Sequence, residues 1–215
     1  MSDIKGCIFD LDGVIVDTAK YHYLAWKKLA QELNFEFTES DNERLKGVSR
    51  MDSLNILLQI GGLSFDDETK VKLAEKKNTC YKEYISHMTP DEILPGVKEF
   101  IRAVKNDGMK TAIGSVSKNT MSILKSINMI DYFDSIIDGN KISHAKPDPE
   151  VFLKAAQELN IEPENCVVFE DAKAGIEAAI NAGMYSIGIG KKEILGRADI
   201  VISSFNEMTT EKLNF

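Results

Sequence analysis

The sequence lacks several features that mark secreted, membrane and nucleic-acid-binding proteins. It has three cysteines, Cys7, Cys80 and Cys166, whose spacing resembles no metal site, so we expect reduced thiols in a cytoplasmic protein. The first residues show no charged-then-apolar signal segment, and no apolar run is long enough to cross a bilayer. The net charge of -8 at pH 7 argues against a general basic surface for nucleic acid.

Internal repeats and low-complexity linkers are also missing from the sequence, and 215 residues suffice for one full domain and a smaller second one. Residues 17–87 show helical periodicity without a strand pattern. From Pro95 onward, short apolar strands alternate with helices, which predicts a doubly wound parallel sheet. We therefore predict an α/β protein in which residues 1–16 and 88–215 form a Rossmann-like core and residues 17–87 form an inserted, all-helical cap.

Apolar spacing and turn residues delimit the expected elements. In the cap, Tyr23, Trp26 and Leu33 recur at helical spacing, and Gly61-Gly62 favours a helix end. Helices are predicted over 20–34, 50–60, 66–87, 98–106, 120–127, 149–160 and 172–182. Strands are predicted over 6–9, 110–114, 135–138, 166–169, 185–189 and 200–202.

Two aspartates, Asp10 and Asp12, follow the first apolar strand. Acidic residues at this end of a strand lie where open α/β sheets bind ligands. A spacing of two puts both carboxylates on one side of an extended chain, and Gly13 lets the backbone turn away. One carboxylate can attack a phosphoryl group while the other exchanges a proton with the leaving or returning oxygen. A solvated polar turn is the simpler alternative, but it does not need two acids flanking a leucine.

Further polar residues end a strand or begin a helix at the same edge of the predicted sheet. Ser115 follows the strand over 110–114, and Ser117-Lys118-Asn119 leads into the next helix. A hydroxyl and successive backbone N–H groups can hold a phosphate there. Taken alone, these residues fit a simple serine cap of the helix equally well.

Three more charged residues are predicted at this edge of the sheet, namely Lys146 and the acidic pair Glu170-Asp171. Pro147 and Pro149 fix the loop around Lys146, whose charge can neutralise a phosphoryl oxygen, although a lone lysine is more often a solvated surface residue. Adjacent acids at the end of a buried strand are costly unless they bind a cation, and oxygen ligands beside a phosphate favour Mg²⁺. A helix cap would account for Asp171 but poorly for Glu170.

The order of these features along the chain is more specific than any one of them. Asp-x-Asp, then Ser, Lys and an acidic pair, each at a strand end, resembles the haloacid dehalogenase superfamily of phosphoryl-transfer enzymes over the whole chain. The resemblance implies that Asp10 is the nucleophile and forms an aspartyl phosphate, and that Asp12 is the general acid/base. It further implies that Mg²⁺ is held by Asp10, the backbone carbonyl of Asp12, Glu170 and Asp171, and the phosphoryl group by Ser115, the Val116 N–H and Lys146. Val116 is bulkier than the residue that the resemblance leads us to expect there.

The cap narrows the substrate class, again by resemblance. His22 and Trp26 lie four residues apart and share a helical face, and Arg50 begins a helix, where its planar group suits a second phosphate. Taken alone, Trp26 would be interpreted as a core residue, and His22 as a helix residue whose hydrogen bonds are made within the protein. With their neighbours they resemble the caps of those superfamily members that interconvert β-glucose 1-phosphate and glucose 6-phosphate.

This second resemblance implies a phosphorylated Asp10 that donates to a small sugar phosphate, with β-glucose 1,6-bisphosphate as intermediate and activator. It implies a distal phosphate site formed by Arg50, Ser117, Lys118 and Asn119. The residues that contact the sugar or couple closure to catalysis would be Thr18, His22, Trp26, Gly47, Ser53 and Lys77.

Other activities remain open on the sequence. A sugar-phosphate phosphatase would use the same core residues and let water attack the aspartyl phosphate. A carbon–phosphorus hydrolase needs a Schiff-base lysine, for which Lys46 and Lys77 are the candidates. A binding protein derived from this fold should have lost Asp10 or the acidic pair, and this chain keeps both. We expect a monomer without nucleic-acid or membrane partners, although the sequence itself does not fix the oligomeric state.

Overall fold

The computed structural model describes residues 3–45 and 49–215, and its contacts divide the chain into two compact units. One unit, here called the core unit, consists of the residues up to Asp17 and from Met88 onward. The other, here called the helical unit, is Thr18–His87.

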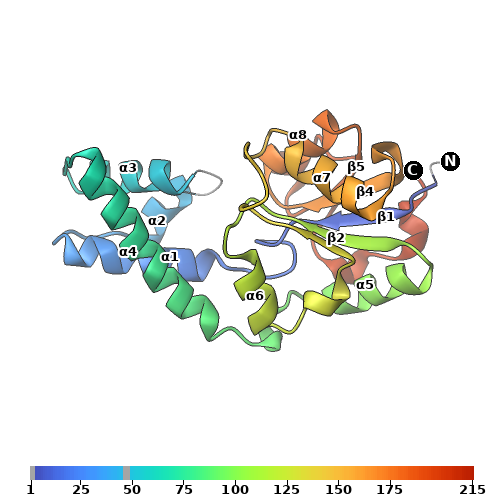
Figure 1. The fold of residues 1–215 in the computed structure, drawn as a ribbon, viewed down its shortest axis with the longest axis horizontal. Helices are drawn as coiled ribbons and strands as arrows, with labels where there is room; N and C mark the ends of the chain where they lie inside the picture. Colours follow the sequence, from blue (N-terminus) through green and yellow to red (C-terminus); the bar gives the residue numbers. More distant parts are fainter. Residues whose placement is uncertain (1–2, 46–48) are drawn as a thin grey trace. The chain divides into compact units, whose positions relative to one another are not determined.

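A parallel sheet forms the centre of the core unit (Figure 1). Within the described ranges it has six strands in the order β3-β2-β1-β4-β5-β6, which confirms the predicted doubly wound sheet. β1 lies between β2 and β4, with Phe9 paired to Ile113 on one side and Phe169 on the other. The carboxyl ends of these three strands therefore lie side by side. The strands are β1 (Gly6–Phe9), β2 (Lys110–Gly114), β3 (Ser135–Ile137), β4 (Cys166–Glu170), β5 (Tyr185–Ile189) and β6 (Ile200–Ile202).

Helices cover both faces of this sheet, so its central strands are apolar on both sides. α7 (Glu150–Leu159) and α8 (Lys173–Asn181) lie on one face, and α5 (Val97–Asn106) lies on the other (Figure 1). Ile8 and Val168 pack with Phe152 of α7, whereas the neighbouring Phe9 and Phe169 stack on each other with ring centroids 4.6 Å apart. Such a ring pair contributes about 1 kcal/mol beyond its buried area.

The remaining helices of the core unit are short. α6 (Thr120–Ser126) follows the loop after β2, and α9 (Lys192–Leu195) follows β5. α6 begins where the sequence predicts it, and α7 and α8 each differ from the predicted ranges by one residue at either end. α9 is not predicted, because four residues are too few to show a helical period.

The helical unit contains helices and no strand in residues 18–45 and 49–87. They are α1 (Ala19–Glu32), α2 (Glu39–Asn42), α3 (Arg50–Ile60) and α4 (Asp67–Ser86). Trp26 and Leu29 of α1 pack with Leu54 and Leu57 of α3 in one apolar cluster. In the part of the chain that is described, no helix combines the length and apolar character needed to cross a membrane.

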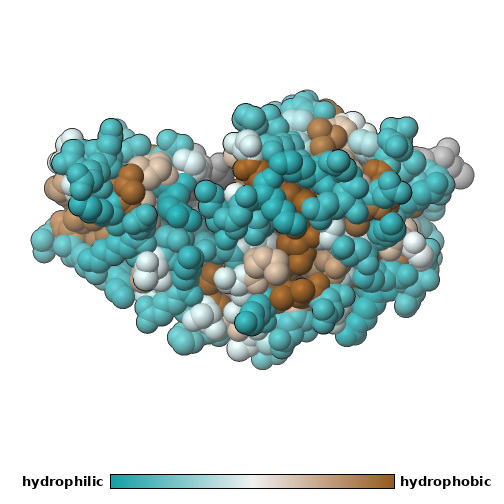
Figure 2. All heavy atoms as spheres, viewed as in Figure 1, coloured by the Kyte–Doolittle hydropathy of each residue, from teal (hydrophilic) through white to brown (hydrophobic). Residues whose placement is uncertain are grey.

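The surface is mostly hydrophilic on the face shown in Figure 2, with hydrophobic residues visible between the polar ones. Exposed large hydrophobic side chains in the core unit include Met121, Leu153 and Ile180. Scattered residues of this kind are ordinary on protein surfaces. Val116 differs from them because it belongs to the predicted phosphate loop, where its side chain is 41% exposed.

Candidate active site

Asp10 comes directly after β1, at the carboxyl edge of the sheet. Its N–H donates to the Phe169 carbonyl at 3.0 Å, and the residue is 7% exposed. Ser115 after β2 and Glu170 at the end of β4 are buried at the same edge. The strand order thus brings together Asp10, Ser115 and Glu170 where open α/β sheets bind ligands.

Lys146 reaches this edge from the loop between β3 and α7. Its Nζ donates to Asp10 Oδ1 at 2.5 Å and to Glu170 Oε1 at 2.7 Å. The same Nζ lies 4.7 Å from the ring centroid of Phe152 on α7. The lysine side chain is 7% exposed, so the predicted phosphate-binding lysine is a buried residue held between two acids and a ring, not a solvated one.

Burial and charge together set the protonation of this group. Burial raises the pKa of Asp10 well above its usual range, the Lys146 charge opposes that rise, and Glu170 and Asp12 add to it. Burial would lower the pKa of Lys146, but the charges of Asp10 and Glu170 outweigh it and hold that pKa above its ordinary value. Lys146 therefore provides a lasting positive charge beside Asp10.

Asp12 lies just before a tight turn in the chain. Gly13 has φ 79°, a left-handed conformation that favours glycine, and its N–H donates to the Val16 carbonyl at 2.7 Å. A Cβ at Gly13 would collide with the carboxylate of Asp171, so this turn passes directly against that side chain. Partial removal from water, followed by the charges of Glu170 and Asp12, raises the pKa of Asp171 to about 7.

Gly175 on α8 makes room for the other member of the acidic pair. A Cβ there would overlap the carboxylate of Glu170, whose Oε2 also accepts the Ala172 N–H at 2.8 Å. Gly175 therefore lets α8 pass close to the Glu170 side chain at the end of β4.

The carboxyl groups here fit a divalent cation. Four acids lie close enough for their charges to interact: Asp10, Asp12, Glu170 and Asp171. Lys146 contributes one positive charge to this group. Carboxylate oxygens are the ligands that Mg²⁺ prefers, and a cation would offset the repulsion that, after burial, raises the Asp10 and Asp171 pKa values.

The loop from Ser115 to Asn119 has backbone and side-chain bonds of its own. The Ser117 N–H donates to Ser115 Oγ at 3.1 Å, and the Asn119 N–H donates to Ser117 Oγ at 3.3 Å. The Gly139 N–H donates to the Ser117 carbonyl at 3.1 Å, which ties this loop to the segment after β3. Ser115 is 1% exposed beside Asp10, whereas Lys118 lies exposed on the loop.

A second group of predicted residues comes together inside the helical unit. Lys77 Nζ of α4 bonds with His22 Nδ1 of α1 at 2.8 Å and lies 4.6 Å from the Trp26 ring centroid. Burial, then the charges of Lys77 and Arg50, lower the pKa of His22 well below its usual range. The neutral ring accepts a hydrogen bond from Lys77 at Nδ1, so its own proton is assigned to Nε2, which can act as a donor.

The other predicted residues of the helical unit lie on different elements. Arg50 is the first residue of α3, is half-buried, and has a pKa lowered by burial. Ser53 of α3 and Thr18 at the start of α1 are both buried. Gly47 and Lys46 lie outside the described residues. The predicted joint phosphate site of Arg50 with Ser117, Lys118 and Asn119 draws on both units and remains a prediction.

Two aromatic residues of these groups are missing from the sequence prediction. Tyr81 lies with its ring centroid 4.1 Å from that of His22, and Phe152 lies under Lys146. Tyr81 stands four residues after Lys77, so a shared helical face could have indicated it. Nothing in the sequence distinguishes Phe152 from the other core phenylalanines.

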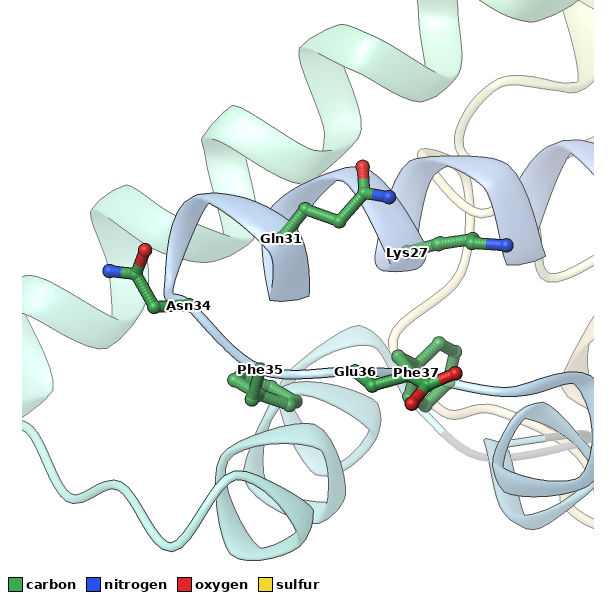
Figure 3. Close-up of a pocket in the computed structure, with 6 residues that line it drawn as sticks. All are labelled: Lys27, Gln31, Asn34, Phe35, Glu36 and Phe37. Atoms are coloured by element: carbon green, nitrogen blue, oxygen red, sulfur yellow. The ribbon is translucent and has the colours of Figure 1, made fainter.

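A hollow of about 410 Å³ lies elsewhere in the helical unit, between α1 and the segment that follows it (Figure 3). Its lining mixes amide, charged and phenylalanine side chains and contains none of the predicted site residues. The lining residues are Lys27, Gln31, Asn34, Phe35, Glu36 and Phe37.

Known proteins resemble this chain over most of its length. Residues 4–183 match the family described as haloacid dehalogenase-like hydrolase. The β-phosphoglucomutase of Bacillus subtilis is 41% identical over 98% of this chain and 94% of its own length. A phosphorylated carbohydrates phosphatase of Thermotoga maritima is 32% identical over 86% of this chain and 84% of its own.

Solved structures agree as well. A crystal structure of the β-phosphoglucomutase from Clostridium difficile has a TM-score of 0.89 and 44% identity, covering 98% of this chain and 95% of that one. The matched family spans most of the chain, including Asp10, Lys146 and the acidic pair. The chain therefore belongs to the haloacid dehalogenase-like hydrolase family, whose predicted signature its sheet edge carries.

Proposed function

We propose that this chain is a Mg²⁺-dependent β-phosphoglucomutase, which interconverts β-glucose 1-phosphate and glucose 6-phosphate. The observation that carries the proposal is the buried contact of Lys146 with Asp10 and Glu170 at the carboxyl edge of the sheet. The full-length similarity to two β-phosphoglucomutases supports the choice of substrate. The reaction would pass through an aspartyl phosphate and β-glucose 1,6-bisphosphate.

Asp10 is the nucleophile in this proposal. One of its carboxylate oxygens attacks the phosphorus of a bound sugar phosphate, and the P–O bond to the sugar breaks as the aspartyl phosphate forms. Lys146, already bonded to Asp10 Oδ1, stabilises the negative charge on the phosphoryl oxygens. Ser115 and the Val116 N–H are the proposed donors to the same oxygens.

Asp12 is the proposed acid and base for the sugar oxygen. It gives a proton to that oxygen as the aspartyl phosphate forms, and takes one from the opposite hydroxyl when the phosphoryl group is returned. Asp12 is partly exposed just before the Gly13 turn, unlike the buried Asp10, so the two acids differ in environment. Such a difference suits one nucleophile and one proton carrier.

Mg²⁺ would be held by Asp10, the Asp12 carbonyl, Glu170 and Asp171, and when bound it would neutralise charge on the phosphoryl group. Two contacts support this assignment: Glu170 accepts from Lys146 and the Ala172 N–H, and Asp171 lies against the Gly13 turn.

The helical unit is the proposed cap that recognises the rest of the substrate. Arg50, with Ser117, Lys118 and Asn119, would take the distal phosphate of the bisphosphate. The proposed sugar-facing or closure-coupling residues are Thr18, His22, Trp26, Gly47, Ser53 and Lys77. A neutral His22 held by Lys77 offers its Nε2 proton to a sugar oxygen.

A phosphatase is the second candidate, because a phosphorylated carbohydrates phosphatase matches 86% of the chain. It would use the same Asp10 chemistry and let water attack the aspartyl phosphate. The two candidates differ in whether water reaches that intermediate between half-reactions.

One assay with two readouts separates these candidates. The protein is mixed with Mg²⁺, β-glucose 1-phosphate and a trace of β-glucose 1,6-bisphosphate, and glucose 6-phosphate and free phosphate are followed together. We expect glucose 6-phosphate with little free phosphate, and no product with Asp10→Asn. Free phosphate without glucose 6-phosphate would instead make the chain a phosphatase.

We also propose a cytoplasmic monomer. The thiols of Cys7, Cys80 and Cys166 are unbridged, and one chain supplies Asp10, Lys146 and Glu170. Light scattering at assay concentrations tests the monomer, and a dimeric mass would contradict it.

A further inference from the structure

The segment between β3 and α7 must hold Lys146 in place without regular structure of its own. Residues 138–149 contain no helix or strand, yet Lys146 within them makes two short bonds to buried acids. A lysine carries four rotatable side-chain bonds, so a fixed ammonium position needs a fixed backbone as well. The bonds that anchor this backbone are therefore part of the site.

Glu150, the first residue of α7, makes the densest set of these bonds. Its Oε2 accepts the Ser143 N–H at 2.9 Å and the His144 N–H at 2.7 Å. Both donors precede Lys146 by two or three residues. The carboxylate thus ties the loop backbone to a helix that packs against β1, β2 and β3.

Lys154, one turn later on α7, extends the same anchor. Its Nζ donates to Glu150 Oε1 and to the Lys141 carbonyl, each at 2.6 Å. These bonds and the loop N–H groups lower the pKa of Glu150 to about 2, so its carboxylate stays charged at neutral pH. Asn181 of α8 holds the far side of the loop through the Pro147 carbonyl at 3.1 Å.

The same side chains could be mistaken for a metal centre, since ligand atoms of His144, Asp148 and Glu150 lie within 4.8 Å of one another. Both Glu150 oxygens already accept hydrogen bonds, Oε2 from two backbone N–H groups and Oε1 from Lys154, and Asp148 Oδ1 accepts the Glu150 N–H at 2.9 Å. The cluster is an anchor for the loop.

We propose that Glu150 is a positioning residue for phosphoryl transfer, holding the loop so that the Lys146 ammonium lies between Asp10 and Glu170. The inference rests on the proposed phosphoryl-transfer function and extends it to a residue that does not itself contact Asp10 or the phosphoryl group. α7 then fixes Lys146 in two ways, through Glu150 on the backbone and through the Phe152 ring under the ammonium.

The test uses a reaction that needs no sugar. Purified Glu150→Ala, Glu150→Gln and the control Glu177→Ala are assayed for Mg²⁺-dependent hydrolysis of acetyl phosphate, which requires phosphoryl transfer to Asp10. Glu177 is a partly exposed acid of α8 paired with Arg197, so its loss removes the same charge without touching the loop. We expect kcat to fall about tenfold to a hundredfold in both Glu150 variants and to stay near wild type in the control.

A double-variant cycle separates positioning from general damage. In a Lys146→Ala background, Glu150→Ala should cost less than about twofold, because its effect acts through the missing ammonium. An equal loss with and without Lys146, or full activity in both Glu150 variants, would overturn the proposal.

Hydrogen exchange provides the second measurement and does not depend on residual turnover. Glu150→Ala should speed exchange of the Ser143 and His144 amides, and Glu177→Ala should not; unchanged exchange would overturn the proposal. Should Glu150→Ala fail to fold, Glu150→Gln takes its place in both measurements. Because acetyl phosphate replaces the sugar phosphate as substrate, these results can be interpreted even if the protein does not isomerise β-glucose 1-phosphate.

Discussion

At the scale of single residues, Lys146 is the centre of the site. A buried ammonium is tolerated when it is paired, and here Asp10 and Glu170 both accept from it. Its raised pKa means that it does not release a proton near neutral pH. In the proposed reaction Lys146 therefore acts as a fixed positive charge, and Asp12 is the group proposed to transfer protons.

Lys146→Ala should therefore remove charge stabilisation from the transferring phosphoryl group. We expect kcat for glucose 6-phosphate formation to fall by about a hundredfold to a thousandfold, measured at saturating β-glucose 1-phosphate and Mg²⁺. Lys173→Ala, which removes an exposed lysine of α8, is the matched control. A loss below about tenfold would contradict the assigned role of Lys146.

His22 gives a prediction about stability and pH. Its pKa is lower in the folded protein than in the unfolded chain, so the unfolded chain binds more protons as the pH falls below about 6.5. This residue's contribution therefore stabilises the fold above that pH and is lost as the pH falls toward the lowered value. Between pH 7.5 and 5.5, we expect the fall in Tm to be about 2–4 °C smaller in His22→Asn than in wild type.

Calorimetry at the two pH values checks this prediction, with the exposed His87→Asn as control. The same fall in Tm for wild type and His22→Asn would mean that His22 is not held neutral by its surroundings.

At the scale of elements, α8 approaches β4 so closely that only a glycine fits at position 175. A Cβ there would overlap the Glu170 carboxylate, although alanine is the better helix former by about 1 kcal/mol. Close packing against the Glu170 side chain outweighs helix propensity at this position.

Gly175→Ala should displace Glu170 and weaken the proposed Mg²⁺ site. We expect the Mg²⁺ concentration for half-maximal turnover to rise about tenfold to a hundredfold, since supporting contacts of metal ligands have effects of that size. A Mg²⁺ titration of activity measures it, with Ala174→Ser on the same helix as control. An unchanged Mg²⁺ requirement would show that Glu170 can move without cost.

Elements with a clear apolar period could be predicted closely, and polar short ones could not. α3 has the predicted bounds, because Leu54, Leu57 and Leu58 face the apolar cluster and Ser49 caps the helix. α2 was missed because Glu39–Asn42 has no apolar residue; it forms through the capping box between Thr38 and Asp41.

At the scale of the whole molecule, the residues proposed to transfer the phosphoryl group and those proposed to recognise the sugar belong to different units. Asp10, Lys146 and Glu170 belong to the core unit, and Arg50 with the His22–Lys77 pair belongs to the helical unit. Substitutions in the helical unit should therefore slow the hydrolysis of a small phosphate ester less than they slow the isomerisation of a sugar phosphate.

Arg50→Ala tests this division. Loss of a charged bond to the distal phosphate should lower isomerisation of β-glucose 1-phosphate about tenfold to a hundredfold, with a smaller effect on hydrolysis of p-nitrophenyl phosphate. Arg44→Ala, an exposed arginine of the same unit, is the control. Equal losses in both reactions would argue against a distal phosphate site at Arg50.

The cluster of Asp10, Ser115 and Glu170 could be predicted from the sequence because it follows from the parallel arrangement of the strands. Parallel strands bring their carboxyl ends to one edge, so Asp10, Ser115 and Glu170 had to meet once the strands were recognised. The anchoring of Lys146 by Glu150 could not be predicted, because loop backbone geometry decides which amides a carboxylate meets. Val116 is bulkier than the resemblance suggests, and it lies exposed on its loop.

A crossover experiment tests the central claim, phosphoryl transfer through Asp10 and a bisphosphate, most directly. β-Glucose 1-phosphate labelled with ¹³C in the sugar is mixed with a second sample labelled with ¹⁸O in the phosphate, and the glucose 6-phosphate formed is analysed by mass spectrometry. The account predicts products carrying both labels, because each sugar receives its new phosphate from the enzyme and leaves its own behind. Glucose 6-phosphate that keeps each sugar with its original phosphate, or ¹⁸O appearing only in free phosphate, would contradict it.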